Sequence, residues 1–241
     1  MKPTNPRHRN AHRLVWPTSL VVVLCLIALA WSLQLAPWRT HDSEPPWIYG
    51  TPGARFTIIE YADLECPYCR AYYPELRDWI DAHHDVNWQW HHFPLAIHEP
   101  AARVEAKLVE CVGRADGQRA FWTATAWVYA HTRGNGDGLP SHLSYPGLHR
   151  NVTRCLQEAS ADAAIQADVD EAQREPIPGT PSLKLVDHAT GRTVLIPGPA
   201  RGDALLSAID QLSASETMET RPPSASPANT NTIAPTMSAP R

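Results

Sequence analysis

Cys66-Pro67-Tyr68-Cys69 is the stretch that decides the fold. It lies between an apolar run at residues 56–61, which is typical of a strand, and residues 70–83, which have the pattern of a helix. At such a junction, free backbone N–H groups and the positive end of the helix dipole favour a thiolate over a thiol. The sequence therefore predicts that Cys66 is a nucleophile. Cys69 is predicted to attack a mixed disulfide formed at Cys66 and so to release the substrate.

Two other roles of a Cys-x-x-Cys pair stay open on the residues alone. One is half of a structural zinc site, which needs a second close pair of Cys or His ligands, and Cys111 and Cys155 stand far apart. The other is an inert structural disulfide, although so short a loop usually makes the bond redox-labile. The redox interpretation is favoured, and we expect neither a metal ion nor another cofactor.

A second feature lies far downstream, where Thr180-Pro181 precedes two strand-like runs at residues 183–186 and 193–196. A cis proline beside the active site removes an N–H donor and leaves the preceding backbone free to pair with a substrate chain. We therefore expect a cis bond at Pro181 and a role for Thr180 and Pro181 in substrate binding.

Together these motifs resemble the DsbA/DsbG group of thioredoxin-fold proteins over about residues 47–214. The resemblance implies an α/β thioredoxin fold, in which helices flank a central mixed β-sheet and a helical insertion spans residues 99–175. It also implies a thiol:disulfide oxidoreductase in which Cys66 attacks, Cys69 resolves and Pro181 faces them. Pro67 and Tyr68 lie between the two sulfurs and belong to the predicted catalytic site.

The same family tends to keep a buried acid six residues before the nucleophile, and Glu60 stands there. A carboxyl on the inward face of that strand can take a proton from Cys69 as this thiol attacks. We therefore include Glu60 in the predicted catalytic site, with a solvated strand residue as the alternative.

The direction of electron flow stays open, because Tyr68 and Thr180 stand where DsbA has His and Val. Pro-Tyr combined with Thr-Pro is more similar to DsbG and its isomerase or reductase relatives. Those relatives carry a large N-terminal dimerisation domain, for which the chain has no room between its apolar segment and Trp47, so we expect a monomer. We favour oxidase-type exchange, with isomerase or reductase activity, or a non-catalytic membrane-anchored binding module, as alternatives.

The N-terminal part of the sequence predicts export. Residues 1–13 are basic and are expected to stay in the cytoplasm, while residues 14–36 are apolar and long enough to span a bilayer. We expect a single-pass anchor, a linker at residues 37–46, and a domain on the periplasmic face of the cytoplasmic membrane. The alternative is a soluble periplasmic protein after signal cleavage, since residues 28–30 have the form that signal peptidase cuts.

The remaining cysteines agree with an oxidising compartment. Cys111 and Cys155 fall in two separate helical patterns, and two buried cysteines of one domain tend to join in such a compartment. We expect a structural disulfide between them, with two unpaired buried thiols as the alternative.

Composition narrows the partners. The 241 residues are 43% hydrophobic with a net charge of −4, which fits one globular domain with appendages and gives no basic stripe for nucleic acid. The expected partners are cysteine-containing exported proteins and a membrane or soluble redox protein. His91 and His92 are adjacent on a predicted strand and point to opposite faces, so with His98 they make a poor metal site.

The insertion and the tail complete the prediction. Residues 101–112 have a helical period that places Val104 on the apolar face and Glu105 on the polar one. The glycine-rich residues 131–149 have no period and are interpreted as a flexible surface loop. Residues 215–241 are rich in Ser, Pro and Thr and are predicted to be disordered.

Overall fold

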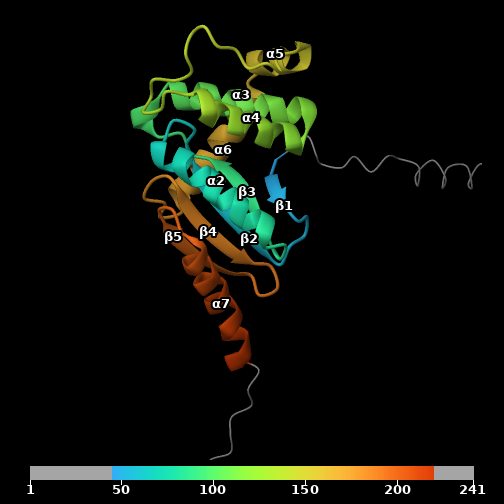
Figure 1. Ribbon diagram of the computed structural model, residues 1–241, viewed down its shortest axis with the longest axis vertical. Helices are drawn as coiled ribbons and strands as arrows, with labels where there is room; N and C mark the ends of the chain where they lie inside the picture. Colours follow the sequence, from blue (N-terminus) through green and yellow to red (C-terminus); the bar gives the residue numbers. More distant parts are fainter. Residues whose placement is uncertain (1–44, 220–241) are drawn as a thin grey trace, which may run out of the picture. The chain divides into compact units, whose positions relative to one another are not determined.

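The computed structural model of the chain describes residues 45–219. In this part, one mixed sheet has the strand order β1-β3-β2-β4-β5 (Figure 1). β2 and β3 are parallel, and the other neighbours are antiparallel. The strands are β1 (Trp47–Gly50), β2 (Phe56–Ala62), β3 (Val86–His92), β4 (Ser182–Asp187) and β5 (Arg192–Pro197). The predicted thioredoxin sheet is therefore present.

Helices flank this sheet on both faces. α2 and α7 lie on one face, where the Tyr72 hydroxyl donates to the carbonyl of Ala200 at 2.6 Å, and α6 packs on β3 from the other. Along the chain, α3 to α6 follow β3 and precede β4, where the helical insertion is expected. The helices are α2 (Pro67–Ala82), η1 (Ala96–His98, a 3-10 turn), α3 (Ala101–Asp116), α4 (Gln118–His131), α5 (Arg150–Gln157), α6 (Ser160–Arg174) and α7 (Gly202–Glu219).

β2 and β3 alternate between the two faces of the sheet, as side chains on a strand must. Trp88 and Trp90 lie on the face of α2, and they pack on each other and on Trp122 of α4. His91 lies on the opposite face, with its Nδ1 4.0 Å from a carboxylate oxygen of Glu171 in α6. His92 lies on the face of Trp90, whose Nε1 donates to it. The two neighbouring histidines therefore point apart, as expected.

The predicted N-terminal segments, residues 1–13 and 14–36, lie outside the described residues, as does most of the linker. Between residues 45 and 219, no helix has the length and apolar character that a membrane span needs. α7 continues to Glu219, so the first residues of the predicted tail are helical, and residues 220–241 lie outside the described part.

The prediction for α3 is wrong at Val104 and Glu105, although Leu108, Val109 and Val112 are buried as the helical period predicts. Val104 is 64% exposed, whereas Glu105 and Glu110 are buried at 1% exposure beside Ala102, Ala106 and Val109. Glu110 is tolerated there because its carboxylate accepts hydrogen bonds from Trp47 Nε1 at 2.6 Å and Arg114 Nε at 2.7 Å. Counting apolar residues alone misses a buried acid whose charge is met by hydrogen bonds from other side chains.

The expected disulfide between Cys111 and Cys155 is present. It joins α3 to α5, and the two Cα atoms lie 5.5 Å apart. It therefore fastens a short, polar helix to the body of the insertion.

Replacing both cysteines, as Cys111→Ala/Cys155→Ala, is expected to destabilise the protein. The bond closes a loop of 44 residues, for which the chain-entropy account gives about 4 kcal/mol. Urea unfolding of the full chain, with the Cys66–Cys69 pair oxidised in both proteins, measures the loss. Exchange activity at low denaturant should stay within a factor of about two, and an unchanged unfolding midpoint would contradict a bracing role.

Candidate active site

The backbone places Cys66 directly before the first turn of α2. Its φ and ψ of −76° and 120° are extended, and Pro67 occupies the first turn. Proline suits this position because its φ is already helical and its missing N–H would have no helical partner. α2 therefore begins at Pro67, three residues before the predicted helix, and the N–H groups of Tyr68 and Cys69 stay available to the Cys66 sulfur.

These surroundings favour the thiolate of Cys66. A hydrogen bond from Cys69 is the largest influence, and together with Thr180 and the N–H groups of Cys69 and Tyr68 it outweighs the opposing effect of burial. The pKa of the Cys66 thiol is lowered from 9.0 to about 6. A thiol with this pKa is mostly ionised at neutral pH, and it is also a good leaving group.

Cys69 has the opposite environment. Its side chain is fully buried, and burial, the hydrogen bond to Cys66 and the nearby Glu60 carboxyl all raise the pKa of its thiol well above the usual value. The two sulfurs are not joined to each other. The two thiols therefore differ in pKa in the direction that a nucleophile and a resolving thiol need.

Glu60 lies inside the protein, not in solvent. Its residue is 1% exposed, and the Oε2 atom has no hydrogen-bond partner within residues 45–219. Burial raises the pKa of its carboxyl from 4.5 to about 8, the Trp88 indole acts against this rise, and Cys66 adds to it. Near neutral pH the carboxyl is therefore close to its titration point and within electrostatic reach of both cysteines.

The segment before β4 forms the other wall of the site. The Thr180–Pro181 bond is cis, and the Cys66 thiol donates to the carbonyl oxygen of Thr180, with 3.4 Å between sulfur and oxygen. The Thr180 hydroxyl is buried without a hydrogen-bond partner among the described residues, and it lies close enough to lower the pKa of Cys66. This hydroxyl is free to turn towards a thiolate.

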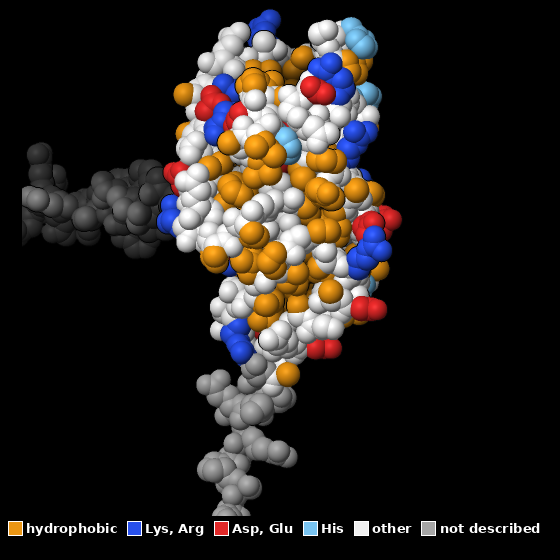
Figure 2. Space-filling model, turned by 90° about the vertical axis from the view of Figure 1, so that its left-hand side faces the viewer, with side chains coloured by type: hydrophobic (Ala, Val, Ile, Leu, Met, Phe, Trp, Pro, Cys, Tyr) orange, Lys and Arg blue, Asp and Glu red, His pale blue; other side chains and the backbone are white. Residues whose placement is uncertain are grey.

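The surface around the site is apolar. Tyr68 is 70% exposed, and Ile97 and Val104, which lie beside the loop residue Gly136, are exposed as well. Figure 2 shows the side of the molecule where α2 begins, with hydrophobic side chains across its middle and charged ones mainly towards its edges. Such a surface suits a partner that presents apolar chain segments.

Sequence reasoning missed Asp63. Its Oδ1 accepts the N–H of Glu65 at 2.8 Å, and its Oδ2 accepts Leu95 N–H at 2.9 Å and binds His98 Nδ1 at 2.7 Å. Its carbonyl oxygen accepts the N–H of Cys66 at 3.1 Å. Asp63 therefore joins η1 to the turn that carries Cys66.

Sequence reasoning also missed Glu65, the residue directly before Cys66. Its carboxylate accepts the N–H groups of Gly136 at 2.8 Å and Gly138 at 2.9 Å and the hydroxyl of Thr132. The glycine-rich segment, interpreted as a flexible surface loop, is thus fastened to the active site over residues 132–138. The signal in the sequence was the pair of acids around Leu64, immediately before the Cys-x-x-Cys motif.

Comparison with known proteins agrees with this geometry. Residues 42–210 match the family model described as thioredoxin. The crystal structure of Pseudomonas aeruginosa DsbA2 is 45% identical, covers 69% of this chain and 93% of its own, and superposes with a TM-score of 0.67. The chain belongs to the DsbA-like branch of the thioredoxin family. This DsbA-like protein is a thiol:disulfide oxidoreductase.

More distant structures share the fold of this DsbA-like protein. A thioredoxin-like oxidoreductase from Silicibacter pomeroyi is 22% identical, covers 73% of this chain and 98% of its own, and gives a TM-score of 0.53. Among curated proteins, a Na+/H+ antiporter NhaA 1 of Salinispora arenicola is 32% identical over 148 residues, or 59% of this chain. The match covers only 22% of the antiporter's length.

The hydrogen bond from Cys69 predicts how Cys66 responds to mutation. Cys69→Ala removes the largest influence that lowers the pKa of the Cys66 thiol, so this pKa should rise from about 6 towards its ordinary value. Cys69→Ser keeps a donor at the same place and should change it much less. Thiolate absorbance in the ultraviolet, recorded against pH, measures both variants, with Cys66→Ala/Cys69→Ala as the blank. Equal values for the Ala and Ser variants would contradict this origin.

Proposed function

We propose that this protein donates disulfide bonds to cysteine-containing exported proteins through Cys66 and Cys69. The observation that carries the proposal is the opposite shift of two thiol pKa values, that of Cys66 down to about 6 and that of Cys69 up. A stabilised Cys66 thiolate favours the reduced form of the pair, so the oxidised pair readily gives its disulfide to another protein.

In the proposed reaction a substrate thiolate attacks the Cys66 sulfur of the Cys66–Cys69 disulfide. The bond between the two sulfurs breaks, and Cys69 leaves as a thiolate that takes up a proton. Protonated Glu60 suits this transfer, because the pKa of its carboxyl is about 8, below that of the Cys69 thiol. In the reverse direction the same carboxylate accepts the proton of Cys69 as this thiol resolves the mixed disulfide.

A second substrate thiolate then attacks the substrate sulfur of the mixed disulfide. The substrate leaves with a new disulfide, and Cys66 departs as the thiolate that its surroundings stabilise. Two electrons have passed from the substrate dithiol to the pair. A redox partner, in the membrane or in solution, must accept them before the next turnover.

Thr180 and Pro181 are proposed to hold the substrate chain beside Cys66. The proline has no N–H, and once Cys66 is ionised the Thr180 carbonyl loses the thiol donor that it accepts here. This carbonyl is then available to a backbone N–H of an extended chain. Tyr68 and the surrounding apolar surface suit the hydrophobic side chains of a chain that has not yet folded.

We infer that the domain works outside the cytoplasmic membrane. The disulfide between Cys111 and Cys155 supports an oxidising compartment, and the basic residues 1–13 before the apolar residues 14–36 support export. The choice between a retained anchor and a cleaved signal is part of the proposal, with the anchor favoured by length.

Isomerisation or reduction is the second candidate. It is favoured by Thr180, whose buried hydroxyl has no hydrogen-bond partner within residues 45–219 and lies close enough to lower the pKa of Cys66, and whose place DsbA fills with Val. A non-catalytic binding module is the third candidate, and it would not need the two sulfurs at all.

A trapping experiment tests the proposal. Cys69→Ala keeps the nucleophile and removes the resolving thiol, so exported proteins should accumulate as mixed disulfides at Cys66 that disappear on reduction. Cys66→Ala/Cys69→Ala is the matched control and should trap none. The wild-type protein, supplied oxidised, should form disulfides in a reduced unfolded protein faster than glutathione disulfide alone. A binding module would give equal yields for both variants and no acceleration.

A further inference from the structure

Two carboxyl groups, those of Glu65 and Glu105, lie close to the active site, and the proposed exchange reaction does not use them. Glu105 of α3 is 1% exposed, and neither of its carboxyl oxygens receives a hydrogen bond from the described residues. It lines one pocket with Gly136 and Gly138, the two residues whose N–H groups bind the fully buried carboxylate of Glu65, so the two carboxyl groups lie close together and influence each other's pKa. Two carboxylates in such a place repel each other strongly, so one of them must hold a proton.

The donors around the pair show which carboxyl is ionised. Glu65 accepts two backbone N–H groups, from Gly136 and Gly138, and the hydroxyl of Thr132. Burial alone would raise the pKa of Glu65, but Thr132, Gly138, Glu105 and Gly136 together lower it. Burial and the neighbouring Glu65 instead raise the pKa of Glu105 to about 9. Glu105 is therefore the protonated carboxylic acid, and Glu65 is the carboxylate that accepts a hydrogen bond from it.

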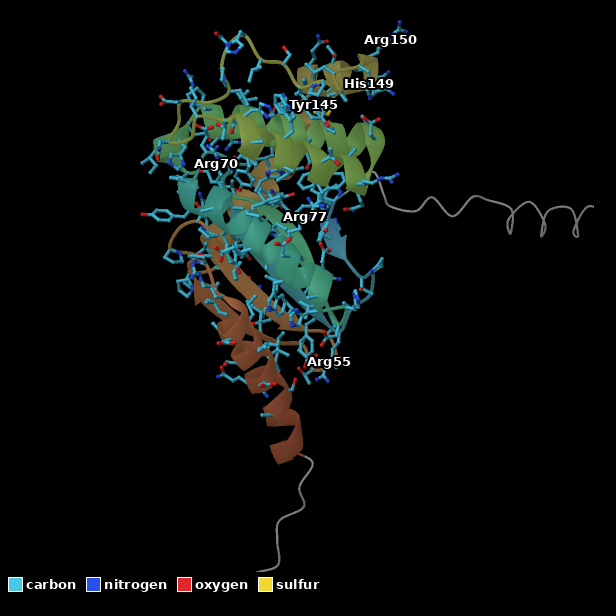
Figure 3. All side chains as sticks on the ribbon, viewed as in Figure 1. Arg55, Arg70, Arg77, Tyr145, His149 and Arg150 are labelled. Carbon is cyan, nitrogen blue, oxygen red and sulfur yellow. A yellow bond between two sulfur atoms is a disulfide. The ribbon has the colours of Figure 1, made fainter. Side chains whose placement is uncertain are left out.

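The charged groups around the pair do not replace this proton. Asp63 is the other nearby acid, and its carboxylate is occupied by His98. Arg70, labelled in Figure 3 near the start of α2, donates to the carbonyl of Thr132 at 3.0 Å. Arg133 donates to the carbonyls of Gly138 and Asp137. Within residues 45–219, these arginines bind backbone oxygens of the loop and no cation pairs with either glutamate.

We propose that Glu65 and Glu105 share one proton, held on Glu105, and that this acid–carboxylate pair is a positioning device that fastens residues 132–138 to the peptide carrying Cys66. The attachment is double. The side-chain carboxylate of Glu65 accepts the N–H groups of Gly136 and Gly138, and the backbone carbonyl of Glu65 accepts the N–H of Asn135 at 2.8 Å. The loop therefore supports the backbone on the N-terminal side of Cys66, whichever way electrons flow.

A metal cation is the alternative that could neutralise two carboxylates. The N–H groups of Gly136 and Gly138 point at Glu65, and donors so placed repel a cation and stabilise an anion. No set of three or more His, Cys, Asp or Glu residues in the described part is arranged to hold a metal. A proton fits the site and a cation does not.

The matched variants Glu105→Gln and Glu105→Ala test the proposal in the full chain. The Gln amide keeps a donor towards Glu65 and has no proton to lose, whereas Ala leaves Glu65 without it. The readout is the hydrogen-exchange protection of the amides of residues 134–138 at pH values from about 6 to about 10, a range that spans the pKa of Glu105. A second readout is the pKa of Cys66, from thiolate absorbance.

In the wild-type protein, protection of the loop should fall at least about tenfold as the pH rises through about 9, the pKa of Glu105. Glu105→Gln should keep the protection at every pH, and Glu105→Ala should lack it at every pH and raise the pKa of Cys66. Glu60 and Cys66 also titrate in this range, but they do so equally in Glu105→Gln, so the difference between the two proteins isolates Glu105.

The stability of the fold gives an independent readout. The folded protein holds the Glu105 proton up to about pH 9, and the unfolded chain releases it near 4.5. Stability from this group is therefore full below 4.5 and declines as the pH rises to about 9, whereas Glu105→Gln lacks this decline. Equal pH dependence of the two proteins would overturn the proposal. So would calcium ions that protect the loop in the wild type but not in Glu105→Gln, since a cation would then hold the pair.

Discussion

The rest of the active site depends on where α2 begins. Because the helix starts at Pro67, the sulfur of Cys66 lies at free N–H groups, while Cys69, one turn later, lies inside the protein. The same sequence motif thus gives one thiol a pKa of about 6 and the other a pKa above its usual value. In the proposed reaction, this difference, and not the mere presence of two cysteines, lets the pair attack, resolve and leave in a fixed order.

The acids near the site divide this work by their surroundings. The Oε2 atom of Glu60 has no hydrogen-bond partner among the described residues, so burial favours the protonated carboxyl, as the proposed proton exchange with Cys69 needs. Asp63 and Glu65 instead accept several hydrogen bonds, which join η1 and residues 132–138 to the turn. The proposed proton exchange and the attachment of η1 and the loop therefore depend on three acids, Glu60, Asp63 and Glu65, that lie close together in the sequence.

Much of the fold could be predicted from local patterns. The apolar run before Cys66, the alternation of Trp88 and Trp90 and the Thr180-Pro181 turn each reflect a short-range rule, and the sheet follows them. The contact between Glu65 and Glu105 could not be predicted in this way, because forty residues separate them and helical periodicity places Glu105 among polar neighbours. The same holds for the loop at residues 132–138, whose order comes from a carboxylate outside it.

The reduction potential of the Cys66–Cys69 pair tests the central claim most directly. It is measured by equilibrating the protein with glutathione at neutral pH, with the disulfide between Cys111 and Cys155 left intact. If the Cys66 thiolate is stabilised as described, the potential should lie near about −120 mV, as in a strong disulfide donor. A value near about −270 mV, typical of a reductant such as thioredoxin, would contradict the account.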